Sequence, residues 1–328
     1  MRVMLHLLVV TFLSFSALAH ADDPRAMQIL EKMTSAAKTL TYEGVFNYQS
    51  GRNLQSIRIF HRSDDNGELE RMISLNGAAR EVIRSNDMVT CISPDGKQIN
   101  VSRRPLSGGF PSDLPRRFSS AAPYYEVEMG GKKRVAGKDA YQLLITPNDN
   151  YRYGYRLWVD VETYLLLKSE LIAQDGDVLE TFSFSSVSTG EPIPDYKFES
   201  LLAEDDMVWH KTEPQEPIDI EEHHHELAWQ VNWLPDGFAL VALQNRLRSS
   251  NGADVEQRVY SDGLSSVSVF IEKIRAKHNH LHGASHVGGI NAFGTIMNAH
   301  FVTVVGEVPA VTVEKIGSAI AFSQAEQE

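Results

Sequence analysis

Apolar residues near the start of the chain follow the period of a helix. Spacings of three and four separate the apolar residues Ile29, Leu30, Met33, Ala37 and Leu40. Asp22 or Asp23 can cap this helix, and Pro24 suits its first turn, where no intrahelical donor is needed. The pattern therefore predicts one amphipathic helix at the start of the first domain.

From Thr41 the apolar period changes to two, which is typical of strands. Tyr42, Phe46 and Tyr48 alternate with polar neighbours, and similar short runs continue to Val187. Turn signals separate the runs at Asp65-Asn66-Gly67, Asn76-Gly77, Pro94-Asp95-Gly96, Ala136-Gly137-Lys138-Asp139 and Asp175-Gly176-Asp177. Short strands at this spacing predict an antiparallel meander. Residues 152–160 carry aromatic side chains at both alternations, so we expect both faces of that strand to be covered.

The strand pattern fails between Ala203 and Glu226, where acidic residues, prolines and three consecutive histidines replace it. This composition predicts an acidic linker over residues 203–226, after a first domain over residues 22–202. Further strands are expected near Phe238–Leu247, Val255–Ser261, Ser265–Ile274 and Gly294–Val305. Pro309 can start a final helix, with Val313, Ile316 and Ile320 as its apolar positions. The second domain, residues 227–322, is thus expected to be small and α+β, with residues 323–328 as a tail.

The first residues have the pattern of an export signal. Arg2 precedes an apolar run from Val3 to Leu18, and Ala19-His20-Ala21 then precedes two aspartates. A positive start, a short apolar run and an A-x-A site predict a signal peptide over residues 1–21, cleaved after Ala21. The alternative is an uncleaved membrane anchor, for which the run is short. Cleavage would make the mature chain a soluble exported protein.

Composition and motifs exclude several classes of protein. Hydrophobic residues make up 42% of the chain, which is enough for a large core and excludes disorder. The net charge of −12 is opposite in sign to that of a typical nucleic-acid binder. The one cysteine, Cys91, cannot form an internal disulfide. Because no nucleophile motif, P-loop or dinucleotide fingerprint occurs, we expect a binding protein without a cofactor rather than an enzyme.

Two groups of side chains carry weaker chemical signals. His278, His280 and His282 would lie on one face of a strand and could supply three nitrogen ligands to zinc. A solvated polar loop is the favoured alternative, because glycines surround the histidines, and no metal is predicted. Candidate anion contacts are the basic residues Arg103, Arg104, Arg116, Arg117, Lys132, Lys133 and Arg134. Ordinary surface charge is the favoured alternative for these residues.

Several stretches of the second domain carry a family resemblance. They are Trp233-Leu234-Pro235-Asp236-Gly237-Phe238, Val259-Tyr260-Ser261-Asp262-Gly263-Leu264, Ser268-Val269-Phe270-Ile271-Glu272 and Val302-Thr303-Val304-Val305-Gly306-Glu307-Val308-Pro309. In the first domain the corresponding stretches include Tyr42 to Phe46, Ala79-Arg80-Glu81-Val82, Cys91-Ile92-Ser93, Tyr124-Tyr125, Arg152-Tyr153-Gly154-Tyr155 with Asp160, and Asp175-Gly176 with Leu179-Glu180. Together they resemble the MucB/RseB family over nearly the whole mature chain.

The resemblance implies a fold and a function. It implies a large N-terminal antiparallel half-barrel with helices, similar to LolA and LolB, and a small C-terminal α+β domain. It implies a periplasmic negative regulator of an envelope-stress sigma factor of the sigma-E or AlgU kind. Such a protein binds the periplasmic part of a membrane anti-sigma factor, RseA or MucA, and shields it from the site-one protease. Lipopolysaccharide or another acyl lipid is implied to release the complex.

Two sets of residues are candidates for these contacts. The candidate lipid groove consists of Tyr42, Phe46, Tyr124, Tyr125, Tyr153 and Tyr155. The candidate anti-sigma contacts are Trp233, Phe238, Tyr260 and Leu264. Packing in the core is the alternative for both sets. A soluble periplasmic carrier of lipids or lipoproteins is the alternative function, and a homo-oligomer is left open.

Overall fold

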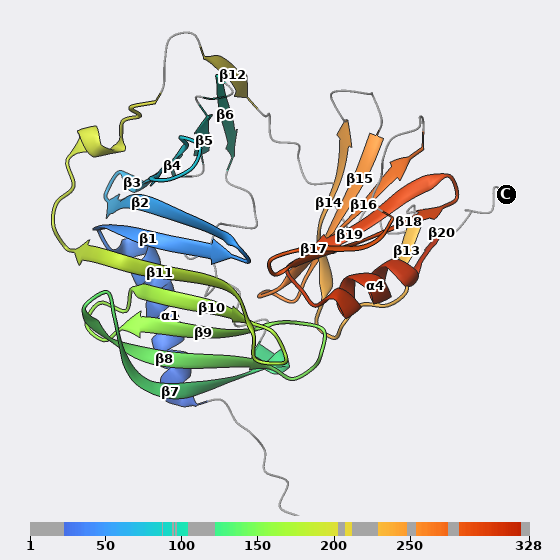
Figure 1. Ribbon diagram of the computed structural model, residues 1–328, viewed down its shortest axis with the longest axis horizontal. Helices are drawn as coiled ribbons and strands as arrows, with labels where there is room; N and C mark the ends of the chain where they lie inside the picture. Colours follow the sequence, from blue (N-terminus) through green and yellow to red (C-terminus); the bar gives the residue numbers. More distant parts are fainter. Residues whose placement is uncertain are drawn as a thin grey trace, which may run out of the picture.

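The computed structural model describes residues 23–86, 88–93, 95, 97–103, 122–202, 207–211, 229–247, 254–274 and 282–322. Two large sheets, each with its own apolar core, form two domains that lie beside each other (Figure 1). The expected signal peptide and tail, and most of the expected linker, lie outside the described residues. None of the described helices is long and apolar enough to cross a membrane.

The first domain contains α1 (Pro24–Thr39), β1 (Tyr42–Ser50), β2 (Asn53–Asp64), β3 (Gly67–Ser74), β4 (Glu81–Ser85), β5 (Met88–Ser93), β6 (Gln98–Arg103), η3 (Ala122–Tyr124), β7 (Tyr125–Val135), β8 (Lys138–Pro147), β9 (Gly154–Asp160), β10 (Leu166–Ile172), β11 (Val178–Thr189), η4 (Asp195–Phe198) and β12 (Val208–Lys211). The second domain contains β13 (Trp229–Val231), β14 (Ala239–Leu247), β15 (Asp254–Ser261), β16 (Ser266–Lys273), β17 (Gly283–Val287), β18 (Ile290–Met297), β19 (His300–Gly306), α4 (Ala310–Ser318) and β20 (Ile320–Phe322).

Helix α1 begins where the sequence predicts it. The carboxylate of Asp23 caps the helix by accepting a hydrogen bond from the Arg25 amide at 2.8 Å, and Pro24 occupies the first turn. Its buried residues, among them Ile29, Leu30 and Met33, join the core of the first domain. The predicted amphipathic helix is therefore confirmed.

Two meanders make up the sheet of the first domain. Its strand order is β12-β6-β5-β4-β3-β2-β1-β11-β10-β9-β8-β7, so that β1 pairs with β11 and joins a meander of β1 to β6 with one of β7 to β11. Every pair is antiparallel except β6 and β12. The sheet curves in front of α1 and remains open, because β12 and β7 lie at its two edges (Figure 1). Strand β12 falls within the stretch that the sequence predicts as a linker.

The second domain packs one helix on an antiparallel sheet. The sheet order is β14-β15-β16-β19-β18-β17, and α4 contributes Val313 and Ile316 to a core with Val267 and Val269 of β16. The predicted final helix is confirmed, although Ile320 belongs to β20 rather than to the helix.

Two expectations for the second domain are wrong. The expected strand Gly294–Val305 is a hairpin of β18 and β19, because Asn298 and Ala299 adopt φ of 46° and 57° and reverse the chain. The glycine-rich stretch expected as a loop contains β17, which pairs with β18 through the turn at Gly288 and Gly289. The fold class itself is confirmed: the chain is mainly β, with a large open antiparallel sheet and a small α+β domain.

Candidate partner-binding site at the domain junction

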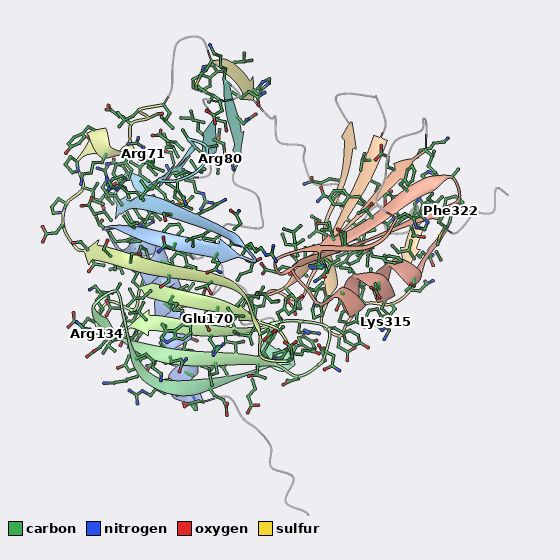
Figure 2. All side chains as sticks on the ribbon, in the orientation of Figure 1. Arg71, Arg80, Arg134, Glu170, Lys315 and Phe322 are labelled. Carbon is green, nitrogen blue, oxygen red and sulfur yellow. The ribbon has the colours of Figure 1, made fainter. Side chains whose placement is uncertain are left out.

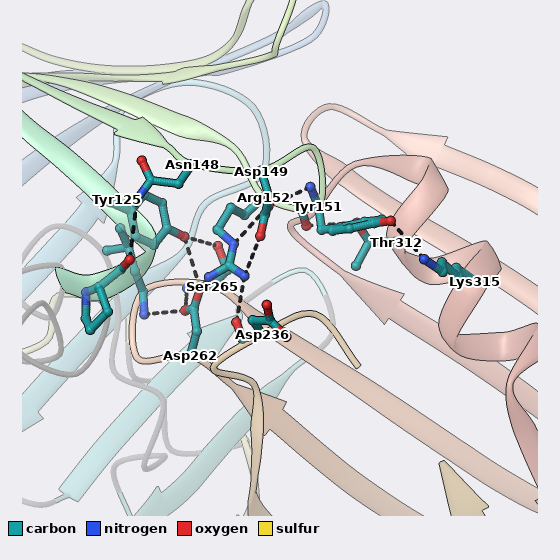
Figure 3. A network of polar contacts seen from close by, with 12 residues as sticks. Tyr125, Asn148, Asp149, Tyr151, Arg152, Asp236, Asp262, Ser265, Thr312 and Lys315 are labelled. Atoms are coloured by element: carbon teal, nitrogen blue, oxygen red, sulfur yellow. Dashed lines mark hydrogen bonds and ion pairs between the residues drawn. The ribbon is translucent and has the colours of Figure 1, made fainter. Parts of the chain in front are cut away.

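A buried arginine connects the two domains. Arg152 lies in the loop between β8 and β9, and its side chain is 0% exposed. Its Nη1 donates to Asp262 Oδ2 at 2.7 Å, and its Nη2 donates to the Asp236 carbonyl at 2.7 Å, both in the second domain (Figure 3). Within its own domain it donates to both oxygens of Asp149, at 3.1 and 2.8 Å. Arg152 thus uses its planar fork to join two domains at once.

Local turns hold both acids that bind Arg152. Asp149 Oδ1 accepts the Tyr151 amide at 2.8 Å, which folds the loop so that Arg152 points toward the second domain. Asp262 Oδ1 accepts the amides of Leu264 and Ser265, at 2.8 and 2.7 Å, and this leaves Oδ2 directed at the arginine. The pair is therefore preorganised by the backbone on both sides of the junction.

Aromatic rings surround the guanidinium of Arg152. The rings of Tyr124, Tyr125 and Phe238 have centroids 4.9, 5.6 and 5.3 Å from its central carbon. The Tyr125 hydroxyl donates to Asp262 Oδ2 at 3.2 Å and hydrogen-bonds to the Ser265 hydroxyl at 3.1 Å. These rings exclude water from the ion pair, which strengthens it while both partners are present.

A second part of the junction brings two acidic side chains together. Glu180 of β11 accepts hydrogen bonds from the Tyr48 hydroxyl, from the Ser50 hydroxyl at 3.0 Å and from the Gly289 amide of the second domain at 3.1 Å. The Tyr155 hydroxyl donates to Glu307 of the second domain at 3.3 Å. Burial, and then the nearby Glu180 carboxylate, raise the pKa of Glu307 to about 7.

Three further contacts tie the loop before β9 to the second domain. The Thr312 hydroxyl donates to the Tyr151 carbonyl at 2.8 Å, at the start of α4, and Lys315 Nζ donates to the Tyr151 hydroxyl at 2.8 Å (Figure 3). Asn291 Nδ2 donates to the Tyr153 hydroxyl at 2.9 Å. The loop before β9 thus contacts both α4 and β18, in addition to the contacts that β7, β9 and β11 make with the second domain.

The candidate groove residues lie in or beside the core of the first domain. Tyr42, Phe46, Tyr125, Tyr153 and Tyr155 are buried there, and Tyr124 is partly buried against it. The hydroxyls of Tyr125, Tyr153 and Tyr155 reach the second domain, as described above. A role of this set in lipid binding stays a prediction.

The candidate anti-sigma contacts lie at the junction or in the second core. Phe238 packs over Arg152, and Leu264 packs against the core of the first domain. Trp233 contacts the Tyr151 ring, with centroids 4.9 Å apart, whereas Tyr260 is buried in the second core. Contact of these residues with a partner stays a prediction.

Three of the basic candidates lie on the hairpin of β7 and β8. Lys133 and Arg134 line a surface hollow of about 400 Å³, whereas the ammonium of Lys132 lies 5.7 Å from the centroid of the Tyr141 ring. Arg103 ends β6, and Arg104, Arg116 and Arg117 lie outside the described residues. His282 is exposed, and His278 and His280 lie outside the described residues. No group of three or more potential metal ligands occurs in the part of the chain that the structure describes.

The charged residues of the junction are not among the candidates chosen from sequence. Arg152, Glu180, Asp262 and Glu307 all lie in the stretches that carry the family resemblance, which is the sequence signal that marks them. Their partners in the other domain lie 84 to 152 residues away along the chain, so their pairing follows from the tertiary fold.

The fold and the junction define a class of two-domain protein, in which an open curved sheet docks on a small α+β domain through a buried ion pair. The model of the MucB/RseB N-terminal domain matches residues 25–202, and that of the MucB/RseB C-terminal domain matches residues 223–321. The chain therefore belongs to the MucB/RseB family, as its sequence resemblance indicates.

Relatives and solved structures agree with this assignment. The chain is 30% identical over 342 residues to the sigma factor AlgU regulatory protein MucB of Pseudomonas aeruginosa, covering 98% of each chain. It is 28% identical over 316 residues to the sigma-E factor regulatory protein RseB of Salmonella typhimurium, covering 96% of each. The structure of the Pseudomonas aeruginosa MucA/MucB complex matches with a TM-score of 0.72 and 29% identity, covering 92% of this chain and all of that one. These relatives are named as regulatory proteins.

Proposed function

We propose that this protein is a periplasmic regulator that binds the periplasmic part of a MucA-like anti-sigma factor. Its family membership supports this function, because relatives are named as regulators of sigma-E and AlgU. The export pattern over residues 1–21 supports the compartment. By binding the anti-sigma factor, the protein would shield it from the site-one protease and so keep the sigma factor inactive.

The observation that carries the proposal is the likeness of the docked domains to partner-bound relatives. The TM-score is 0.72 with the MucA/MucB complex and 0.69 with a structure of MucB in complex with MucA(peri), but 0.61 with a crystal structure of MucB. This difference supports the inference that the docked arrangement of the two domains is the one that binds the partner. The junction of Arg152 with Asp262 and Asp236 holds this state.

Release by an acyl lipid is the second part of the proposal. The family resemblance supports it, together with the aromatic residues that fill the space between α1 and the sheet. Burial of each CH₂ group contributes about 0.8 kcal/mol, so part of one acyl chain could offset the loss of several polar contacts. Lipid and anti-sigma factor would then favour different arrangements of the domains.

A titration tests this function. The mature chain is titrated into a fluorescently labelled periplasmic segment of MucA, followed by anisotropy, with and without lipopolysaccharide. We expect saturable binding that lipopolysaccharide reverses. Binding that lipopolysaccharide leaves unchanged would overturn the release step, and no binding would overturn the function.

Two variants test the role of the junction. Arg152→Met should weaken binding at least tenfold, because it disfavours the docked arrangement. Arg62→Met is the matched control: Arg62 also binds two acids, Asp64 and Asp195, and one carbonyl, but all within the first domain and with its side chain 21% exposed. Equal affinities for the two variants would refute the part assigned to the junction.

A further inference from the structure

The hollow on the first domain gathers positive charge on a protein that is acidic overall. Its lining includes Lys133 and Arg134 from the β7–β8 hairpin, Trp158 from β9, Lys168 from β10 and Ser183 from β11. None of its lining residues is acidic, although the whole chain carries a net charge of −12. Such a local excess of positive charge creates a positive electrostatic potential that attracts anions.

The strand register explains how these side chains meet. Lys168 is the ladder partner of both Trp158 and Ser183, so these three residues lie in one row across β9, β10 and β11. Trp158 alternates with Leu157 and Val159, which are fully buried, and it therefore lies on the opposite face of the sheet. Phe184 also lines the hollow, and its ring packs against those of Tyr42 and Phe46, with centroids 6.3 and 5.9 Å apart, so the hollow borders the aromatic residues named as a lipid groove.

One cation of the hollow is held in place before any ligand arrives. The ammonium of Lys168 lies 4.4 Å from the centroid of the Trp158 ring and 2.7 Å from Glu170 Oε1. The Glu170 carboxylate is shared with Arg156, whose Nε lies 3.0 Å from its other oxygen. Because two cations share one carboxylate, positive charge remains in excess beside the hollow.

The other two cations, Lys133 and Arg134, form no ion pair with any residue that the structure describes. The Nε of Arg134 donates to the Gly137 carbonyl at 3.3 Å. This bond orients the guanidinium at the tip of the hairpin. Arg134 lies at the end of the first domain that faces away from the second domain (Figure 2).

We propose that this hollow binds a phosphate group, either free or as the ester of a sugar or lipid headgroup. A planar guanidinium, two ammonium groups and the Ser183 hydroxyl are the donors that suit the oxygens of a tetrahedral dianion. The volume of about 400 Å³ is at the lower end of the range for small-molecule sites and exceeds what one phosphate needs, so it leaves room for one sugar ring. The test of this site needs neither an anti-sigma factor nor lipopolysaccharide, so its failure can be distinguished from failure of the function proposed above.

Neighbouring lysines on one strand give a matched pair of variants. Lys132 and Lys133 are both exposed, but Lys133 lines the hollow whereas Lys132 lies over the Tyr141 ring. Lys133→Glu and Lys132→Glu change the net charge of the protein equally. Only a specific site distinguishes them, since nonspecific attraction depends on total charge.

The experiment is an NMR titration of the full mature chain at low ionic strength. The probes are inorganic phosphate, glucose 1-phosphate and phosphatidylcholine vesicles with or without phosphatidic acid, the vesicles being followed by cosedimentation. We expect saturable shifts of the Trp158 indole and Ser183 amide signals, at least tenfold weaker binding for Lys133→Glu, and less than threefold change for Lys132→Glu. Ser183→Ala should weaken binding by a smaller factor.

The three arms identify the source of the phosphate. Tighter binding of glucose 1-phosphate than of inorganic phosphate assigns an ester, and binding to vesicles that requires phosphatidic acid assigns a lipid headgroup. Equal affinity for the first two without vesicle binding assigns free phosphate. Absence of saturable shifts with every probe, or equal weakening by Lys132→Glu and Lys133→Glu, overturns the site.

Discussion

Replacement of Arg152 by methionine tests whether the buried ion pair holds the domains together. Methionine fills much of the same space but leaves Asp262, whose side chain is 0% exposed, without its cation. Asp149 is 29% exposed and can be hydrated by water, so the main penalty comes from Asp262. Removing one partner of a buried pair costs about 3 to 5 kcal/mol.

The domains can avoid this penalty by separating, because separation exposes Asp262 to water. We therefore expect the Arg152→Met variant to keep the secondary structure of both domains but to lose their docking. Small-angle X-ray scattering should show a larger radius of gyration, while the far-UV circular dichroism spectrum is unchanged. Arg62→Met, which removes contacts within the first domain only, should cost about 1 kcal/mol or less and leave the radius of gyration unchanged.

A second substitution makes this reasoning refutable. Asp262→Asn removes the buried charge, and its remaining oxygen can still accept the Leu264 and Ser265 amides. In the double variant, Arg152→Met with Asp262→Asn, docking should recover by about 2 kcal/mol relative to Arg152→Met alone. A compact Arg152→Met variant, or a double variant no more compact than the single one, would show that this pair does not hold the junction.

Two other predictions concern pH and a helix glycine. The docked arrangement favours the protonated form of Glu307, because its pKa is raised there from 4.5 to about 7. The stability that this carboxyl group contributes to docking is therefore fully present below about pH 4.5 and is lost as pH rises through about 7, by up to about 3 kcal/mol. The radius of gyration measured by scattering should therefore increase as pH rises, and Glu307→Gln should abolish this increase. Glu314→Gln, at an exposed position on α4, should retain it. The reverse result would contradict the assignment to Glu307. Gly317→Ala should lower the denaturation midpoint although alanine favours helices by about 1 kcal/mol, because its Cβ would lie 2.5 Å from Phe293 Cδ1; a higher midpoint would refute this steric argument.

The fold could be predicted where local patterns decide it. Asp23 and Pro24 mark the start of α1 because capping depends on neighbours in sequence. The hairpin at Asn298 and Ala299 could not be predicted so easily, because alanine rarely takes a positive φ and the turn is imposed by the pairing of β18 with β19. The sequence does not predict β17 for a related reason. Its hydrogen bonds to β18 stabilise a strand in a glycine-rich stretch whose residues favour a loop.

The site was only partly predictable. Aromatic side chains such as Tyr125 and Tyr155 stand out in the sequence, but a sequence does not say that their hydroxyls reach Asp262 and Glu307. Desolvation of Arg152 depends on rings from both domains, which only the folded chain brings together. Lys133 is recognisable from the sequence as a basic candidate, whereas its position in the same hollow as Lys168 follows only from the folded sheet.

One hairpin connects the hollow with the junction. Ser183 of the hollow and Glu180 of the junction both lie on β11, and their ladder partners on β10 are Lys168 and Leu171. A ligand of the hollow can change docking only if it binds the docked and undocked arrangements with different affinity. The ratio of phosphate affinities between the wild type and the undocked Arg152→Met variant measures that difference. By linkage, phosphate must shift the docking equilibrium by the same factor, so equal affinities would mean that the two sites act independently.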